Sequence, residues 1–177
     1  MKLVVGLGNP GNQYENTRHN VGFLGIDMLA QAVANEEWLE DKKNDTKYIK
    51  LETLLLIKPQ TFMNVSGKAV SNIVNLYKIK PANIWVLHDD LDLLLGYYKI
   101  QKARGPQLHY GVKSIEEKLG IKDFWRVRIG VDNREKENRT SGEEYVLQKF
   151  NDEERVMLTK VLKEVVNKLS MVLLKSS

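Results

Sequence analysis

The sequence predicts an α/β fold in which a mixed, twisted β-sheet is flanked by helices. Apolar runs of strand length alternate along the chain with segments whose apolar residues recur at helical spacing. The chain has 177 residues, of which 42% are hydrophobic and 28% are charged, and this suits a folded domain with a sizeable core. We therefore expect residues 1–177 to form a single domain.

The first third of the chain predicts a strand, a helix and more strand. Residues 2–7 are an apolar run that ends in glycine-rich sequence, which is typical of a buried strand. Apolar residues then recur at helical spacing over residues 21–33, whereas residues 36–47 are polar and indicate a connection. Residues 48–57 predict one strand or a hairpin that ends before Pro59, because proline cannot continue a central strand ladder.

The middle of the chain repeats the alternation. Ser66 is placed to cap a helix whose apolar stripe ends at Tyr77. Residues 84–87 predict a buried strand that is closed by an acidic turn at Asp89 and Asp90. Residues 97–101 alternate in polarity and predict a further strand.

The last third predicts a helix over residues 111–119 and a strand over residues 125–131, with its two arginines on one face. Residues 132–142 are charged and rich in turn formers, which favours a surface loop. Asn151 with Glu154 three residues later is typical of a capping box, and it begins a long amphipathic helix.

Ligands of α/β sheets bind at the carboxyl ends of the strands, which here would carry residues 8–11, 59–64 and 88–92. Residues 6–11 (GLGNPG) match the glycine spacing of dinucleotide-binding loops, but Pro10 removes a backbone N–H that such a loop needs. The chain has no cysteine and carries neither a serine-hydrolase nor a zinc-peptidase motif. Any catalysis must therefore use oxygen or nitrogen groups.

Four polar residues near that edge form a candidate hydrolytic site. His19 precedes the first helix and Asp89 follows a different strand, and a carboxylate beside an imidazole stabilises the imidazolium that forms on proton abstraction. Water activated by His19 would then attack an ester or a similar acyl group. The side-chain amides of Asn9 and Asn64 could stabilise the oxyanion. Each residue taken alone is explained equally well by a helix cap or a turn.

Positive charge is concentrated in one segment of the chain. The net charge is +4, yet residues 99–128 contain eight basic and three acidic residues, a net +5, together with three aromatic residues. A polyanionic partner such as nucleic acid would explain this concentration. The alternative is an ordinary solvated charged face.

Five strings of residues, in order over nearly the whole chain, resemble the motifs of bacterial-type peptidyl-tRNA hydrolases. They are VGLGNPG at 5–11, TRHNVG at 17–22, KPQTFMNVSG at 58–67, HDDLD at 88–92 and RVRIG at 126–130. The resemblance implies a monomeric enzyme without metal or cofactor that hydrolyses the ester between peptide and tRNA. Such an enzyme recycles tRNA from stalled or dropped-off peptidyl-tRNA.

The resemblance also implies a role for each matching residue. His19 would be the general base, Asp89 its orienting partner, and Asn9 and Asn64 would bind the substrate and stabilise the transition state. The implied peptide-side contacts are Tyr14, Met63 and Asn64, and the implied contacts with tRNA phosphate are Lys99 and Arg128. We also expect Tyr110, where the family carries asparagine, to bind substrate, and Lys102 and Arg104 of the basic segment to contact phosphate. No apolar run approaches the length of a membrane span, so we expect a cytoplasmic protein. The partner that the resemblance implies is the acceptor end of peptidyl-tRNA.

One segment departs from the family pattern. Family members usually carry a glycine-rich loop that ends Gly-Gly-His-Asn-Gly, whereas residues 103–111 read ARGPQLHYG. His109 is kept, but Tyr110 replaces the asparagine, and a phenol cannot donate and accept hydrogen bonds as an amide does. The departure in loop 103–110 leaves a catalytically weak or inactive tRNA- or RNA-binding homologue as the alternative to the hydrolase. A general esterase unrelated to RNA is a third possibility, against which the basic segment argues.

Overall fold

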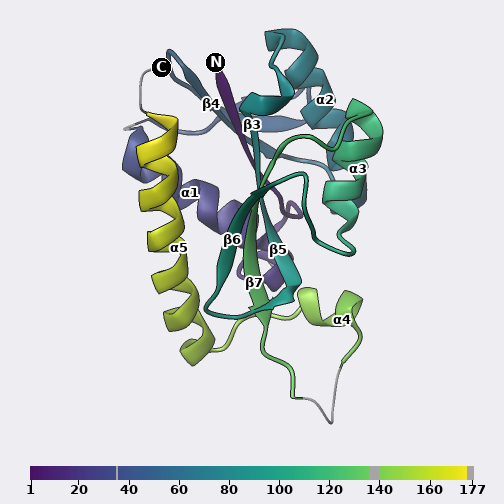
Figure 1. Cartoon of the computed structure of the whole chain (residues 1–177), viewed down its shortest axis with the longest axis vertical. Coiled ribbons are helices and arrows are strands. Elements are labelled where there is room, and N and C mark those ends of the chain that lie inside the picture. Colours follow the sequence, from purple (N-terminus) through teal and green to yellow (C-terminus); the bar gives the residue numbers. More distant parts are fainter. Residues whose placement is uncertain (35, 136–139, 175–177) are drawn as a thin grey trace.

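The computed structural model describes residues 1–34, 36–135 and 140–174. A seven-stranded sheet lies between two layers of helices, with α1 and α5 on one face and α2 and α3 on the other (Figure 1). The elements are β1 (Lys2–Gly6), α1 (Val21–Val33), β2 (Leu39–Asp41), β3 (Thr46–Lys50), β4 (Leu54–Pro59), α2 (Ser66–Tyr77), β5 (Ile84–Leu94), β6 (Tyr98–Lys102), α3 (Tyr110–Leu119), β7 (Trp125–Asp132), α4 (Gly142–Val146) and α5 (Asp152–Leu173). Short 3₁₀ turns η1 (Asn12–Tyr14), η2 (Arg18–Asn20), η3 (Met63–Val65) and η4 (Pro81–Asn83) join them.

The strand order in the sheet is β2-β3-β4-β1-β5-β7-β6. β1 pairs in parallel with β4 and β5, and β5 pairs in parallel with β7. β3 pairs antiparallel with β2 and β4, and β6 pairs antiparallel with β7. The sheet is therefore mixed, as the sequence predicts. Its parallel centre brings the segments after β1 and β4 to the same edge as the end of β5.

The hydrophobic core has two parts because the central strands are covered on both faces. Along β1, Val4 packs into the core on the side of α1 and α5, whereas Leu3 and Val5 pack into the core on the side of α2 and α3. Successive side chains of a strand point to opposite faces, so a strand buried on both faces reads as a continuous apolar run. Among the described residues, no helix combines the length and apolarity that a membrane crossing requires.

Several local features confirm the sequence prediction. The capping box at the start of α5 is present, because Asn151 accepts from the backbone N–H of Glu154 and Glu154 accepts from that of Asn151. Gly120 ends α3 in the left-handed conformation, at φ 66°. Residues 48–57 belong to a hairpin of β3 and β4.

Two local predictions are wrong, and the predicted loop 132–142 is confirmed in its described residues except at its two ends. Residues 36–47 contain a short edge strand, β2, and the start of β3. The polar composition of this segment predicted neither strand. Ser66 is the first residue of α2 and does not cap it; the N-cap is Val65, and the Ser66 hydroxyl bonds to the Phe62 carbonyl. Within the predicted loop 132–142, Gly142 already begins α4, while residues 136–139 lie outside the described residues.

The predicted acidic turn at Asp89 and Asp90 is also wrong, because β5 continues through both residues to Leu94. Both carboxylates are buried. Burial of a carboxylate is tolerated only when it is paired, and here two histidines bond to Asp89 and Arg128 bonds to Asp90. These partners lie far away in the sequence, so the local pattern could not reveal that the strand continues.

Candidate active site

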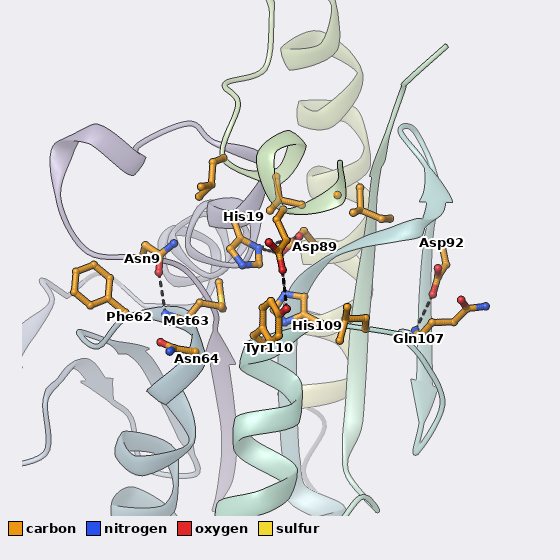
Figure 2. Close-up of a pocket in the computed structure, with 16 residues that line it drawn as sticks. Asn9, His19, Phe62, Met63, Asn64, Asp89, Asp92, Gln107, His109 and Tyr110 are labelled. Carbon is orange, nitrogen blue, oxygen red and sulfur yellow. Dashed lines mark hydrogen bonds and ion pairs between the residues drawn. The ribbon is translucent and has the colours of Figure 1, made fainter. Parts of the chain in front are cut away.

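A cavity of about 680 Å³ lies at the edge of the sheet where β1, β4 and β5 end (Figure 2). Its wall includes Asn9 after β1, Met63 and Asn64 after β4, Asp89 in β5, and His19 before α1. The four residues predicted to be catalytic therefore line one cavity. The parallel pairing of β1 with β4 and β5 brings them together, since Asn9 follows β1, Asn64 follows β4 and Asp89 lies in β5 near the same edge.

His19 and Asp89 form a hydrogen-bonded pair. The Nδ1 atom of His19 lies 2.9 Å from Oδ1 and 3.0 Å from Oδ2 of Asp89. Because a carboxylate only accepts, Nδ1 carries the proton and Nε2 is the basic nitrogen, on the cavity side of the ring. The prediction that Asp89 orients His19 agrees with this geometry.

His109 is a second histidine on the same carboxylate. Its Nε2 atom lies 2.8 Å from Oδ1 of Asp89, and its Nδ1 atom accepts from the backbone N–H groups of Gly111 and Val112. His109 is thus the N-cap of α3. Because those two amides can only donate, Nδ1 is unprotonated, and the proton of a neutral ring is on Nε2, which donates to Asp89. The helix start therefore fixes the tautomer of His109 and helps to hold Asp89 in place.

The electrostatics of the pair suit a general base near neutral pH. Burial alone would lower the pKa of His19, but the charge of Asp89 and the hydrogen bond to it raise the pKa of His19 above its ordinary value. Burial alone would raise the pKa of Asp89, but His19 and His109 outweigh it and hold that pKa well below its usual range. Asp89 is therefore a carboxylate at every pH at which the protein would work.

His88 is buried behind this site and has a different task. Its Nδ1 atom donates to the backbone carbonyl of Asp89 at 2.7 Å, and its ring meets that of His109 edge to face at a centroid distance of 5.0 Å. Burial, with a smaller contribution from His109, lowers the pKa of His88 to about 3. His88 is therefore neutral and supports the strand next to Asp89.

Asn9 presents an amide nitrogen to the cavity. Its Oδ1 atom accepts from the backbone N–H of Met63 at 2.9 Å, and since that N–H can only donate, the amide nitrogen must be on the other side. Figure 2 shows this nitrogen turned towards His19. The side chain of Asn20 brackets the backbone of Asn9, because it accepts from its N–H at 2.8 Å and donates to its carbonyl at 2.9 Å. Asn9 is thus a rigidly held donor.

The other peptide-side residues differ in their exposure to the cavity. Asn64 lies at its exposed rim, and the buried Met63 lines it. Tyr14 does not line the cavity: its ring packs edge to face against Phe62, which does, at a centroid distance of 6.4 Å. Tyr14 therefore acts on the cavity wall through Phe62, a residue that the sequence analysis did not single out.

The unusual loop forms one wall of the cavity. Gln107, Leu108, His109 and Tyr110 all line it, and the backbone N–H of Gln107 donates to Oδ2 of Asp92 at 2.8 Å. The hydroxyl of Tyr110 donates to Oε1 of Glu143 in α4 at 2.7 Å. The loop is thus tied to both β5 and α4.

The predicted phosphate contacts fall into two groups. Lys99 in β6 and Arg104 after it are exposed, and Lys102 pairs with Asp123 at 3.0 Å on the surface. Arg128 is only 9% exposed, and its guanidinium donates to Asp90 at 2.6 Å and to Gln101 at 2.7 Å. This geometry gives Arg128 a structural task within the sheet that its place in the sequence did not reveal.

A metal ion at this site would have to bind the same His and Asp atoms that are already hydrogen-bonded to each other. His19, Asp89 and His109 place ligand atoms within 4.8 Å of one another. Nδ1 of His19 and Nε2 of His109 both carry protons, because each donates to the Asp89 carboxylate. A metal ion would instead require the free lone pair of each nitrogen. The arrangement therefore fits a hydrogen-bonded relay better than a metal centre.

Sequence analysis missed the parts of the site that depend on tertiary contact. His109 was identified only as a residue kept from the family pattern, and its bond to Asp89 gave no local signal. The predicted surface loop ends at Gly142, and no local signal predicts that Glu143, the next residue, lines the cavity. The one usable signal is the position of His109 two residues before the predicted helix 111–119, close to where caps are found.

Comparison with known proteins identifies the family. A sequence model described as "Peptidyl-tRNA hydrolase" matches residues 3–177. The peptidyl-tRNA hydrolase of Persephonella marina is 41% identical over 163 residues, which cover 92% of this chain and 85% of that protein, and that of Aquifex aeolicus is 40% identical over 168 residues, covering 94% and 86%. The crystal structure of the peptidyl-tRNA hydrolase of Acinetobacter baumannii is similar with a TM-score of 0.86 at 30% identity and covers 98% of this chain and 88% of that one. The chain therefore belongs to the peptidyl-tRNA hydrolase family.

Proposed function

We propose that this protein hydrolyses the ester that joins a peptide to the terminal ribose of tRNA. The observation that carries this proposal is the preformed pair of His19 and Asp89 in a cavity that also holds the Asn9 amide. Membership of the peptidyl-tRNA hydrolase family supports the ester between peptide and tRNA as the substrate. The function follows from the site because an imidazole base and an amide donor are what acyl transfer to water needs.

In the proposed reaction, Nε2 of His19 takes a proton from water while the water oxygen attacks the ester carbonyl carbon. Asp89 keeps Nδ1 protonated and stabilises the imidazolium that forms. Collapse of the tetrahedral intermediate breaks the bond from carbon to the ribose oxygen, and the imidazolium returns the proton to that oxygen. The products are a peptide with a free carboxyl group and a tRNA with a free hydroxyl group.

Asn9 and Asn64 would supply hydrogen bonds to the oxyanion and to the substrate. Asn9 is the better candidate for the oxyanion, because its amide oxygen is occupied by Met63 and its nitrogen faces His19. A donor that is already in position costs no reorganisation when charge develops on the carbonyl oxygen. Asn64, at the exposed rim, is better placed to contact the peptide as it enters.

The direct test of this function uses an N-acetylated aminoacyl-tRNA with the wild-type protein in the presence of a chelator. We expect release of the N-acetylated amino acid and of uncharged tRNA in stoichiometric amounts. Binding of the same tRNA without cleavage would instead support the RNA-binding alternative. Cleavage of simple esters at a rate equal to that of the tRNA ester would support the general esterase.

Tyr110 allows the effect of the unusual loop to be measured. We expect Tyr110→Asn to change the cleavage rate by less than about tenfold, because the His19 and Asp89 pair does not depend on the phenol. The measurement is the single-turnover rate of the variant on the same substrate, with Tyr110→Phe as the control that keeps the ring. A loss of all activity in Tyr110→Phe would show that the Tyr110 hydroxyl belongs to the reacting groups.

The exposed and buried cations are expected to respond differently to removal. Lys99→Ala should weaken tRNA binding and reduce the slope of log Kd against log salt by about one, because an exposed lysine releases counterions when it meets a phosphate. Arg128→Ala should instead lower the free energy of unfolding by about 3–5 kcal/mol, since it leaves the Asp90 carboxylate buried without its partner. Filter binding over a salt series measures the effect of Lys99→Ala, and urea denaturation measures the effect of Arg128→Ala. An Arg128→Ala protein of wild-type stability would contradict the structural role.

A further inference from the structure

The cavity carries negative charge that the hydrolytic chemistry does not use. Asp92 and Glu143 line it together with Asp89, and within residues 1–34, 36–135 and 140–174 no lysine or arginine lines it. Asp89 is compensated by its two histidines. Over residues 1–34, 36–135 and 140–174, neither Asp92 nor Glu143 has a basic partner within ion-pair distance. Asp92 and Glu143, which are both exposed to solvent, therefore give the described part of the cavity wall a negative charge.

Glu143 is oriented in this wall by one hydrogen bond, and the helix that carries it is positioned by a second contact. Its Oε1 atom accepts from the Tyr110 hydroxyl at 2.7 Å, across from the start of α3. Two residues later in α4, the ring of Tyr145 lies under the guanidinium of Arg18, 4.1 Å from the ring centroid, and Arg18 directly precedes His19. The Arg18–Tyr145 contact thus positions α4 beside the residue that precedes His19, and the Tyr110 hydrogen bond orients the exposed Glu143 carboxylate, whose Oε2 atom accepts no hydrogen bond from the described residues.

Asp92 adds a second carboxylate on the same part of the cavity wall as the unusual loop. Its Oδ2 atom accepts from the Gln107 backbone, a hydrogen bond that leaves the negative charge in place. Figure 2 shows Asp92 and Gln107 on the opposite side of His19 and Asp89 from Asn9 and Phe62. The Asp92 carboxylate therefore lies in the half of the cavity away from Asn9 and Phe62.

We propose that Glu143, held by Tyr110, makes the enzyme select among its substrates by the charge of the esterified amino acid. Esters of lysine or arginine are favoured over esters of glutamate or aspartate. This inference rests on the proposed hydrolase function and names a substrate preference within it. The tRNA phosphates do not enter into the comparison, because every substrate carries them and they meet the exposed cations outside the cavity.

Coulomb's law sets the size of the expected preference. Two unit charges about 8 Å apart in a partly hydrated cavity change a rate ratio by about two- to thirtyfold, depending on how well water screens them. Glu143→Gln removes the charge but keeps the side-chain shape and an oxygen that can accept from Tyr110. Asp92→Asn does the same for the second carboxylate.

The experiment measures kcat/KM for one tRNA body that carries N-acetyllysine, N-acetylglutamate or N-acetylglutamine. For the wild type we expect the lysine to glutamate ratio to exceed about fourfold, because the two side chains differ by two charges, with glutamine between them. In Glu143→Gln this ratio should move towards one, and in the double variant with Asp92→Asn it should reach about one. Tyr110→Phe keeps both charges but removes the hydrogen bond that orients Glu143, so a preference for lysine should remain and be smaller than in the wild type.

The glutamine ester separates this inference from the function on which it rests. If the wild type does not cleave N-acetylglutaminyl-tRNA at all, the proposed function is wrong. If it cleaves all three esters equally, or if the preference for lysine persists undiminished in the double variant, the function stands and the charge selection is wrong. Each enzyme's rate on the glutamine ester serves as its own reference, so partial loss of folding does not alter the ratios.

Discussion

His19→Ala is expected to lower the single-turnover rate of N-acetyl-aminoacyl-tRNA cleavage by about 10²–10⁴-fold, the usual contribution of a general base. The affinity for tRNA should change little, because His19 lies inside the cavity and does not belong to the exposed cations. Rapid-quench kinetics with enzyme in excess measure the rate, and filter binding measures the affinity. Free imidazole added to the variant should restore part of the rate.

Two outcomes would contradict the assignment of His19. An equal loss of rate and affinity would make His19 a binding or structural residue. A His19→Ala protein that retains wild-type turnover would move the base to another group in the cavity. Thermal unfolding of the variant provides the control, since a large drop in Tm would show that the fold and not the chemistry had been changed.

Asp89→Asn is the second change with a large expected effect, and it acts through the pKa of His19. In the wild type, the rate should rise with pH as His19 loses its proton and should level off above a pKa that Asp89 raises beyond the ordinary histidine value. In Asp89→Asn, burial remains and lowers the pKa of His19, so the rising limb should shift to lower pH. The plateau should fall by about 10²–10⁴-fold, because nothing stabilises the imidazolium.

The direction of the shift is the decisive part of this prediction. A pH–rate profile of kcat/KM for both proteins between pH 5 and pH 9 reports the pKa of the free enzyme. A reduced plateau with an unmoved limb would show that Asp89 acts only as a structural support. A rising limb that moves to higher pH in Asp89→Asn would show that Asp89 does not raise the pKa of His19, and it would contradict the ion pair.

The fold was largely predictable from the sequence because its central strands are buried on both faces. Continuous apolar runs in β1 and β4 and helical spacing in α1 and α2 are local signals, and the predicted bounds agree with the structure within a few residues. The end of β5 was not predictable, because Asp89 and Asp90 are acceptable in a buried strand only with partners that the chain brings from elsewhere.

The candidate site was predictable in part. The rule that ligands bind at the carboxyl ends of parallel strands correctly brings Asn9, Asn64 and Asp89 to one cavity. It could not show that His109 shares the carboxylate of Asp89, since that bond depends on how α3 begins. Nor could charge counting separate the exposed Lys99 from the buried Arg128, because both are positive in the sequence.

The central claim is that water activated by His19 attacks the acyl carbon of the ester. A single turnover of N-acetyl-aminoacyl-tRNA in ¹⁸O-labelled water, followed by mass spectrometry of the products, tests it most directly. We predict one ¹⁸O atom in the carboxyl group of the released N-acetylated amino acid, with none in the tRNA or in Asp89. Label in the tRNA, or label in Asp89 with an unlabelled acyl product, would contradict direct attack by water.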